Sequence, residues 1–236
     1  MTDLKYKRVL LKISGEAFCG ESETGIDFGK VDQIADLIKQ IRAEGVEVAV
    51  VNGAGNLFRG ANQGRQIDRE DADYIGMVAT IMNSLALRSV LNEKSISARV
   101  YSAWGIEMVA PMFDEIQAKA DLEAGKVVIS TAGTGKPFFT TDTAGVQRAV
   151  DLNCDLMIKA STVDGVYSSD PKKDSNACKY EKISYDEILE NDLKVLDRSA
   201  VEIAKENHLK IVVCEFSIDN ILKVVSGEEV GTLIGS

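Results

Sequence analysis

The chain has 236 residues and a mass of 25.6 kDa, enough to bury a core in one large domain or two small ones. Its formal net charge of −10 argues against broad nucleic-acid binding, which needs clustered positive charge, but not against a small phosphorylated ligand. Four dispersed cysteines and a single histidine argue against a zinc site, so we assign no metal-binding residue.

The N-terminal region carries no targeting signal that we can identify. Its apolar patch is too short for a signal peptide, and no small-residue cleavage site follows it. We find no stretch that approaches the roughly 18 apolar residues of a membrane helix. These observations predict a cytoplasmic protein without a membrane partner.

Short apolar runs alternate with longer helical patterns along the whole chain. In order, we predict strand 8–14, helix 27–45, strand 46–53, helix 70–93, strand 98–103, helix 114–125, strand 126–133, helix 143–153, strand 154–161, an irregular stretch at 163–183, helices near 184–191 and 197–208, strand 210–216, helix 218–225 and a short strand at 231–235. Asp27 and Gly45 carry the start and stop signals of the first helix.

This alternation predicts an α/β fold. Strands that are apolar throughout and separated by helices form mostly parallel sheets covered on both faces, which is a three-layer α/β/α sandwich. No linker, repeat or low-complexity tract interrupts the pattern. We therefore predict a single domain over residues 1–236.

The long helix at 70–93 is apolar on more than one face. Ile75, Val78, Ile81, Met82 and Leu85 recur at helical spacing, and further apolar residues are Met77, Ala79, Leu87 and Val90. This is more apolar surface than one contact with a sheet requires. We predict that the helix packs against its counterpart in a dimer.

Two glycine-containing turns follow the first two strands, at the sheet edge where ligands of such folds bind. In KISG (12–15), Lys12 is either an edge or solvent-reaching residue, or a cation beside a small phosphate turn formed by Ser14 and Gly15. In GAGNLFRG (53–60), a plain strand-to-helix turn is one interpretation. The other is a phosphate site in which Gly53 and Gly55 expose backbone N–H groups and Arg59 supplies charge.

The run TAGTGKPFFTTDTAG (131–145) is the most unusual stretch. A helix start explains Thr140, Thr141 or Asp142, because Thr and Asp are good N-caps. It does not explain two glycine turns, a proline and an aromatic pair. These features fit a loop that cradles a nucleotide.

The run TVDGVYSSDP (162–171) carries a turn signal. Asp164-Gly165 lies between Val163 and Val166, which predicts a hairpin. Such a hairpin leaves Tyr167 and Asp170 facing a ligand. With no histidine base or nucleophile elbow in the sequence, phosphoryl transfer fits these residues best, because it needs positioning and charge neutralisation.

Six motifs together resemble the bacterial uridylate (UMP) kinases, a family with the amino-acid-kinase fold. They are KISGEA, GNLFRG, GMVATIMN, AGTGKPFFTTD, VDGVYSSDP and the terminal GTLI. The resemblance runs essentially from residue 7 to 235, with these motifs in order. The resemblance implies Mg²⁺-dependent transfer of the γ-phosphoryl group of ATP to UMP, in pyrimidine nucleotide biosynthesis. It also implies a homohexamer built from dimers.

The resemblance also assigns residues to the two substrates. For ATP it implies Lys12, Ser14, Gly15, Gly55, Arg59, Ser161, Tyr167 and Asp170. For UMP it implies Ala54, Asp73, Thr134, Gly135, Lys136, Pro137, Phe138, Phe139, Thr140 and Thr141. Lys12, Arg59 and Asp142 would be catalytic, with Asp142 orienting Lys12.

Three features depart from the family pattern or concern regulation. Ala54 replaces the middle glycine of a common triple, which is compatible with binding unless that position needs a positive φ. The segment 104–113, WGIEMVAPMF, is atypical. The loop at 20–25 lies in a region linked to GTP activation in some members, so GTP and UTP are candidate effectors.

Two other functions remain open at this stage. One is a kinase of the same fold that phosphorylates carbamate, acetylglutamate or another amino acid, although those relatives lack the PFFTTD loop. The other is a non-catalytic storage or binding protein built on this fold. Such a protein would lack a complete phosphate site.

Overall fold

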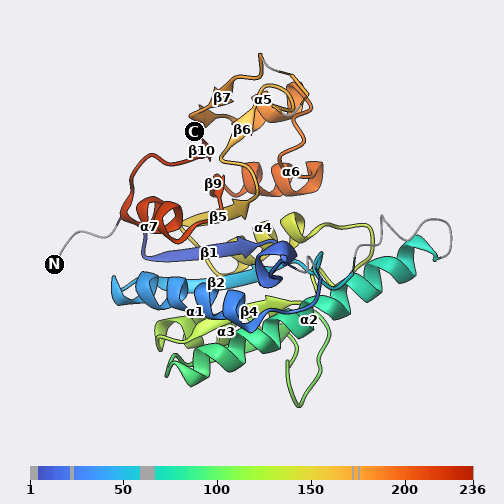
Figure 1. Cartoon of the computed structure of the whole chain (residues 1–236), viewed down its shortest axis with the longest axis vertical. Coiled ribbons are helices and arrows are strands. Elements are labelled where there is room, and N and C mark those ends of the chain that lie inside the picture. The colour runs from blue at the N-terminus through green and yellow to red at the C-terminus, as the bar shows by residue number, and fades with distance from the viewer. Residues whose placement is uncertain (1–4, 22–23, 59–66, 172, 175, 236) are drawn as a thin grey trace.

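The computed structural model describes residues 5–21, 24–58, 67–171, 173–174 and 176–235. An eight-stranded sheet forms its centre, in the order β3-β4-β2-β1-β5-β9-β10-β8 (Figure 1). Its strands are β1 (Arg8–Ile13), β2 (Glu47–Asn52), β3 (Ala98–Ser102), β4 (Val127–Thr131), β5 (Leu156–Ser161), β8 (Lys182–Ile183), β9 (Lys210–Glu215) and β10 (Thr232–Ile234). The first five strands and β9 run parallel, whereas β10 is antiparallel to β9.

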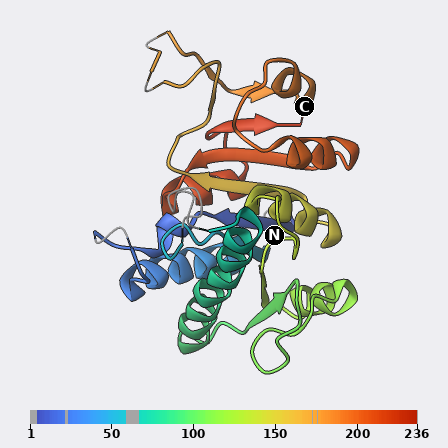
Figure 2. The ribbon, with the colours of Figure 1, turned by 90° about the vertical axis from the view of Figure 1, so that its right-hand side faces the viewer.

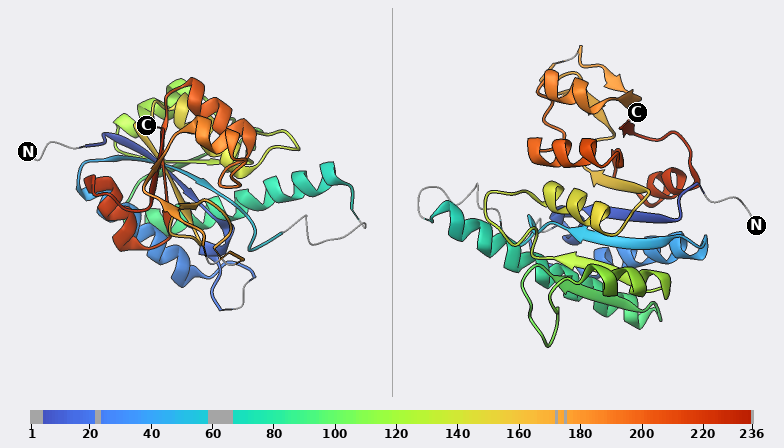
Figure 3. Two further views of the ribbon diagram at one scale, coloured as in Figure 1. Left: turned by 90° about the horizontal axis from the view of Figure 1, so that it is seen from above. Right: turned by 180° about the vertical axis from the view of Figure 1, so that it is seen from behind.

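Helices cover both faces of the sheet (Figures 2 and 3). One face carries α1 (Phe28–Ala43), α2 (Arg69–Glu93) and α7 (Ile218–Ser226). The other carries α3 (Glu115–Glu123), α4 (Thr141–Asp151), α5 (Tyr185–Glu190) and α6 (Arg198–Glu206). Side chains of each strand alternate between two apolar clusters, one under each helical layer. The predicted three-layer sandwich is confirmed.

The predicted start and stop of the first helix are also confirmed. The Asp27 side chain accepts the N–H groups of Gly29 and Lys30, which caps α1. Gly45 follows the helix with a φ of 87°, a left-handed conformation that glycine adopts at little cost.

Helix α2 presents its apolar residues differently from the prediction. Met77, Ala79, Leu87 and Val90, which seemed surplus to one sheet contact, are buried in the protein. Ile75, Val78 and Met82 are instead 41%, 52% and 52% exposed. The reason is that both sets have helical spacing, and spacing alone does not say which stripe meets the sheet.

We found no stretch with the apolar length of a membrane helix in the sequence, but α2 comes close to one in length and composition. Among the described helices, it is the one that is long and apolar enough to cross a bilayer by those criteria alone. However, 50% of its apolar window is buried inside the protein, as in a core helix.

The predicted hairpin at Asp164-Gly165 is wrong. The two-residue strand β6 (Val166–Tyr167) pairs antiparallel with β7 (Lys179–Tyr180), which lies more than ten residues further along the chain. A Cβ at Gly165 would lie 2.6 Å from Thr232 Oγ1, so this glycine permits a close approach to β10 rather than a tight hairpin. The stretch predicted as irregular thus contains three short strands, β6, β7 and β8.

Candidate active site

Three charged side chains form a chain of ion pairs at the carboxyl edge of the sheet. Asp142 Oδ1 lies 2.7 Å from Lys12 Nζ, and its Oδ2 lies 2.5 Å from Lys159 Nζ. The three side chains are only 12%, 14% and 13% exposed for Lys12, Asp142 and Lys159 respectively. Lys159 Nζ also donates to the carbonyl of Val195. One carboxylate therefore fixes two buried cations.

The sheet and one helix build this cluster. Lys12 on β1 and Lys159 on β5 are direct neighbours in register, so they leave the same face of the sheet. Lys12 is thus on a central strand, and the edge-residue alternative is wrong. Asp142 lies in the first turn of α4, and Gly145 helps that helix to come close to the sheet, since a Cβ there would lie only 3.0 Å from Met157 Cε on β5.

Asp142 is not the cap of its helix. The N-cap is Thr140, whose side chain accepts the N–H groups of Asp142 and Thr143. The carboxylate of Asp142 is therefore committed to the two lysines. The contact that the sequence predicted between Asp142 and Lys12 is confirmed as an ion pair.

Burial and the neighbouring charges both shift the pKa values of Asp142 and Lys159. Burial raises the pKa of Asp142, but the Lys12 and Lys159 cations more than offset this and hold that pKa below its ordinary value. Burial lowers the pKa of Lys159 below its ordinary value; Asp142 offsets part of this effect, and Lys12 adds to it. Asp142 is consequently a fixed anion at neutral pH.

Two glycine turns pack against each other beside the cluster. A Cβ at Gly15 would lie 2.2 Å from the backbone nitrogen of Gly55, and one at Gly53 would lie 3.1 Å from that of Gly15. Gly53 N–H also donates to the Ile13 carbonyl. Ala54, which lies between Gly53 and Gly55, does not adopt a positive φ, so its methyl group causes no backbone strain. The two turns thus lie against each other, but the Gly53 N–H is bonded within the protein, so the interpretation that it is exposed for a phosphate is wrong.

A cavity of about 580 Å³, which we call the acceptor cavity, opens between these turns and α2. It is lined by Ala54, Gly55, Phe58, Ile67, Arg69, Ala72, Asp73, Gly76, Met77, Thr80, Gly133, Thr134, Phe139, Thr140 and Thr141. The structure thus brings together most of the residues predicted for the UMP side. Gly135, Lys136, Pro137 and Phe138 belong to the same loop but do not line this cavity.

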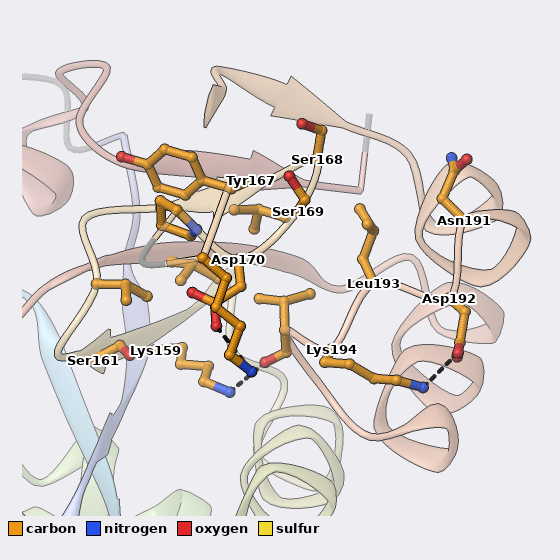
Figure 4. A pocket seen from close by; sticks show the side chains of 17 residues that line it. Lys159, Ser161, Tyr167, Ser168, Ser169, Asp170, Asn191, Asp192, Leu193 and Lys194 are labelled. Atoms are coloured by element: carbon orange, nitrogen blue, oxygen red, sulfur yellow. Dashed lines mark hydrogen bonds and ion pairs between the residues drawn. The ribbon is translucent and has the colours of Figure 1, made fainter. Parts of the chain in front are cut away.

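A second cavity of about 550 Å³, the donor cavity, is lined in part by Lys159. Tyr167 and Asp170 lie above Lys159 and Ser161 (Figure 4). These three predicted donor-side residues, Ser161, Tyr167 and Asp170, therefore do meet in one place. Ser14 lies instead in an adjoining hollow that Ser161 also borders. The predicted role of Arg59 falls outside the described residues.

Several residues of this site escaped the sequence analysis. Lys159 carries the same signal as Lys12, a lysine inside an apolar strand, and could have been found by it. Asp197 caps α6 and also accepts the hydroxyls of Thr140 and Thr143, which ties α6 to the start of α4. No local pattern identified that contact.

The described residues contain no group of three or more His, Cys, Asp or Glu side chains suited to a metal ion. Magnesium is usually bound by one or two carboxylates together with substrate phosphates rather than by a protein cage. The site is compatible with a metal ion that is carried by the phosphates of a nucleotide.

Comparison with known proteins gives consistent matches over the whole chain. Residues 7–215 match the model of the amino acid kinase family. The chain is 45% identical to the uridylate kinase of Bacteroides thetaiotaomicron, over 98% of both chains. The structure of UMP kinase from Bacillus anthracis superposes with a TM-score of 0.92 at 38% identity, over 98% of this chain and 96% of that one. For UMP kinase from Ureaplasma parvum the TM-score is 0.91 at 33% identity, over 99% and 100%.

Proposed function

The chain belongs to the amino acid kinase family, and we propose that it transfers the γ-phosphoryl group of ATP to UMP, giving UDP for pyrimidine nucleotide synthesis. Its full-length likeness to uridylate kinases supports this activity. The observation that carries the proposal is the chain of ion pairs at the carboxyl edge of the sheet. Lys159 lines the donor cavity, and Asp142 directly follows Thr141 of the acceptor cavity.

ATP occupies the donor cavity in this proposal. Tyr167, Asp170 and Ser161 hold its nucleoside part, while its phosphates reach toward Lys12, Ser14, Gly15 and Gly55. The turns at Gly15 and Gly55 support this arrangement, because they pack against each other at the same edge of the sheet and backbone N–H groups of such turns are a common way to bind phosphate. Arg59 would add charge to the same region.

UMP occupies the acceptor cavity. Asp73 accepts a ribose hydroxyl, and the loop from Thr134 to Thr141 surrounds the rest, with Ala54 near the phosphate. An oxygen of the UMP phosphate then forms the new P–O bond to the γ-phosphorus, while the bond from that phosphorus to the leaving ADP oxygen breaks.

Lys12 is the residue that stabilises this step. The negative charge on the transferring group and on the leaving oxygen is stabilised best by a cation that is already held in place. Asp142 holds Lys12, and Lys159 provides a second cation on the donor side. Asp142 is a positioning residue in this scheme, because its two oxygens are occupied by the lysines.

The family suggests the metal ion, the assembly and the effectors of the protein. The Mg²⁺ that the family implies would be held by the phosphates of ATP and would reduce their negative charge. We further propose that the chain acts as one cytoplasmic domain, assembles into a homohexamer from dimers, and responds to GTP or UTP. No nucleic-acid or membrane partner is part of this proposal.

Substrate choice tests the proposed function. We expect ADP release with UMP and at least about 10²-fold lower kcat/KM with CMP, because a site that hydrogen-bonds one base edge leaves buried groups unpaired with another. The assay uses ATP and Mg²⁺ with UMP, CMP, dCMP, carbamate and acetylglutamate in parallel. Comparable kcat/KM for CMP and UMP would refute the base selectivity. Turnover of a carboxylate or carbamate instead of UMP, or of nothing, would refute the activity.

A further inference from the structure

The loop between β4 and α4, residues 132–140, is held in an unfavourable backbone conformation. Gly133 and Gly135 have φ values of 57° and 78°, which glycine tolerates. Ala132 and Phe138 also have positive φ, 60° and 70°, which costs free energy for residues with a Cβ atom. The loop conformation therefore depends on contacts with the rest of the protein.

Besides the bond from Thr140 to Asp197, three hydrogen bonds to backbone groups of this loop hold it from outside. Ala132 N–H donates to Thr80 Oγ1 at 2.9 Å, at the start of the loop. Phe138 N–H donates to Asp73 Oδ2 at 2.8 Å, near its end. In the middle, the indole Nε1–H of Trp104 donates to the Gly135 carbonyl at 3.0 Å.

The middle contact is close and well supported. A Cβ at Gly135 would lie 3.0 Å from Ala103 Cβ and 3.1 Å from Trp104 Nε1, so the loop rests directly on the segment after β3. The Trp104 ring packs against Tyr74 of α2, with ring centroids 5.7 Å apart. Tyr74 directly follows Asp73, which holds the far end of the loop, so the same helix supports both contacts.

The three contacts differ in their relation to the substrate. Asp73 and Thr80 line the acceptor cavity, so their substitution changes the cavity itself. Trp104 does not line it. Its ring packs against a cluster that includes Met77, which does line the cavity, but its indole N–H reaches the cavity only through Gly135 of the loop. A change at Trp104 thus reports the effect of loop position on binding. It also gives the atypical segment 104–113 a role.

We propose that Trp104 is a positioning residue for the acceptor: its indole N–H fixes Gly135 and thereby the loop that closes over UMP. This inference rests on the proposed function, since it names a determinant of the same acceptor site. The donor cavity lies on other elements, so ATP binding should be independent of Trp104.

The test is Trp104→Phe, which keeps an aromatic ring against Tyr74 but removes the N–H donor. We expect KM for UMP to rise about tenfold, in the range for the loss of one hydrogen bond, with KM for ATP unchanged. Tyr101→Phe is the matched control. It also removes one buried donor, the hydroxyl that Asp121 accepts at 2.7 Å, but on the opposite face of β3. It should lower Tm without changing KM for UMP.

The protein contains a single tryptophan, which gives a second readout on the unmodified enzyme. UMP should change the tryptophan emission with a midpoint equal to its binding constant, and ATP alone should not. An unchanged KM for UMP in Trp104→Phe, equal changes in both KM values, or emission that ignores UMP would overturn the inference. Wild-type enzyme that turns over no UMP would instead overturn the proposed function.

Discussion

Asp142 joins two lysines, and a single substitution distinguishes this role from capping. Asn is about as good an N-cap as Asp, so Asp142→Asn would be silent if the residue only began α4. Because Asp142 fixes Lys12, we expect kcat to fall by roughly 10²-fold or more. Lys12→Ala should be at least as severe. The double variant should be little worse than the worse single variant, since residues that act as a unit are not additive.

The same substitution should also lower the stability of the protein. Lys159 shares the same carboxylate, so Asn leaves two buried cations without their counter-charge, and Tm should fall as well. Asp114→Asn is the matched control, because Asp114 caps α3 by accepting the Gln117 N–H away from the site. It should leave both kcat and Tm nearly unchanged. Near-normal kcat for Asp142→Asn would show that the lysine contact is not needed.

At the scale of elements, one hydroxyl joins the C-terminal strand to the donor cavity. Thr232 Oγ1 accepts the Val166 N–H at 2.8 Å and donates to the Tyr180 carbonyl at 2.5 Å, so β10 holds β6 and β7 together. Strand β6 carries Tyr167 into the cavity.

Thr232→Val keeps the shape of the side chain and removes both bonds. We expect KM for ATP to rise about three- to tenfold, as for one or two lost hydrogen bonds, with KM for UMP unchanged. Thr232→Ser should retain the wild-type value, because the hydroxyl is kept. A rise in both KM values, or in that for UMP alone, would contradict the assignment of β6 to the donor side.

Elements with a strong local signal were predictable, and contacts between distant elements were not. Apolar periodicity located β1 to β5, β9, β10 and the helices around them, because each of these elements buries apolar side chains of its own. It missed the two-residue strand β8 at the edge of the sheet. Strand β6 has only two residues and a partner beyond a long connection, so a local turn signal suggested the wrong hairpin. Trp104 and Thr80 form hydrogen bonds with backbone groups of the loop at 132–140, which is distant from both in the sequence. Their roles depend on the packing of α2, which a single sequence does not encode locally.

At the scale of the whole molecule, α2 has two faces with different tasks. Its inner face carries Asp73 and Thr80, which hold the loop of the acceptor cavity. Its outer face exposes a stripe of Tyr74, Ile75, Val78 and Met82, at positions that share one side of a helix. Contiguous apolar surface of this kind typically marks a protein contact.

We therefore expect two copies of the chain to pair through the outer face of α2, with such dimers building the proposed hexamer. Sedimentation at micromolar concentration should give a mass several times the 25.6 kDa of one chain. Val78→Glu places a charge in the centre of the stripe and should shift the protein to smaller species, because an unpaired charge is costly to bury. Ile116→Glu is the matched control, since Ile116 is 82% exposed but lies on α3, on the opposite side of the sheet. It should leave the assembly intact. A wild-type monomer, or an assembly unchanged by Val78→Glu, would show that this face does not form the contact.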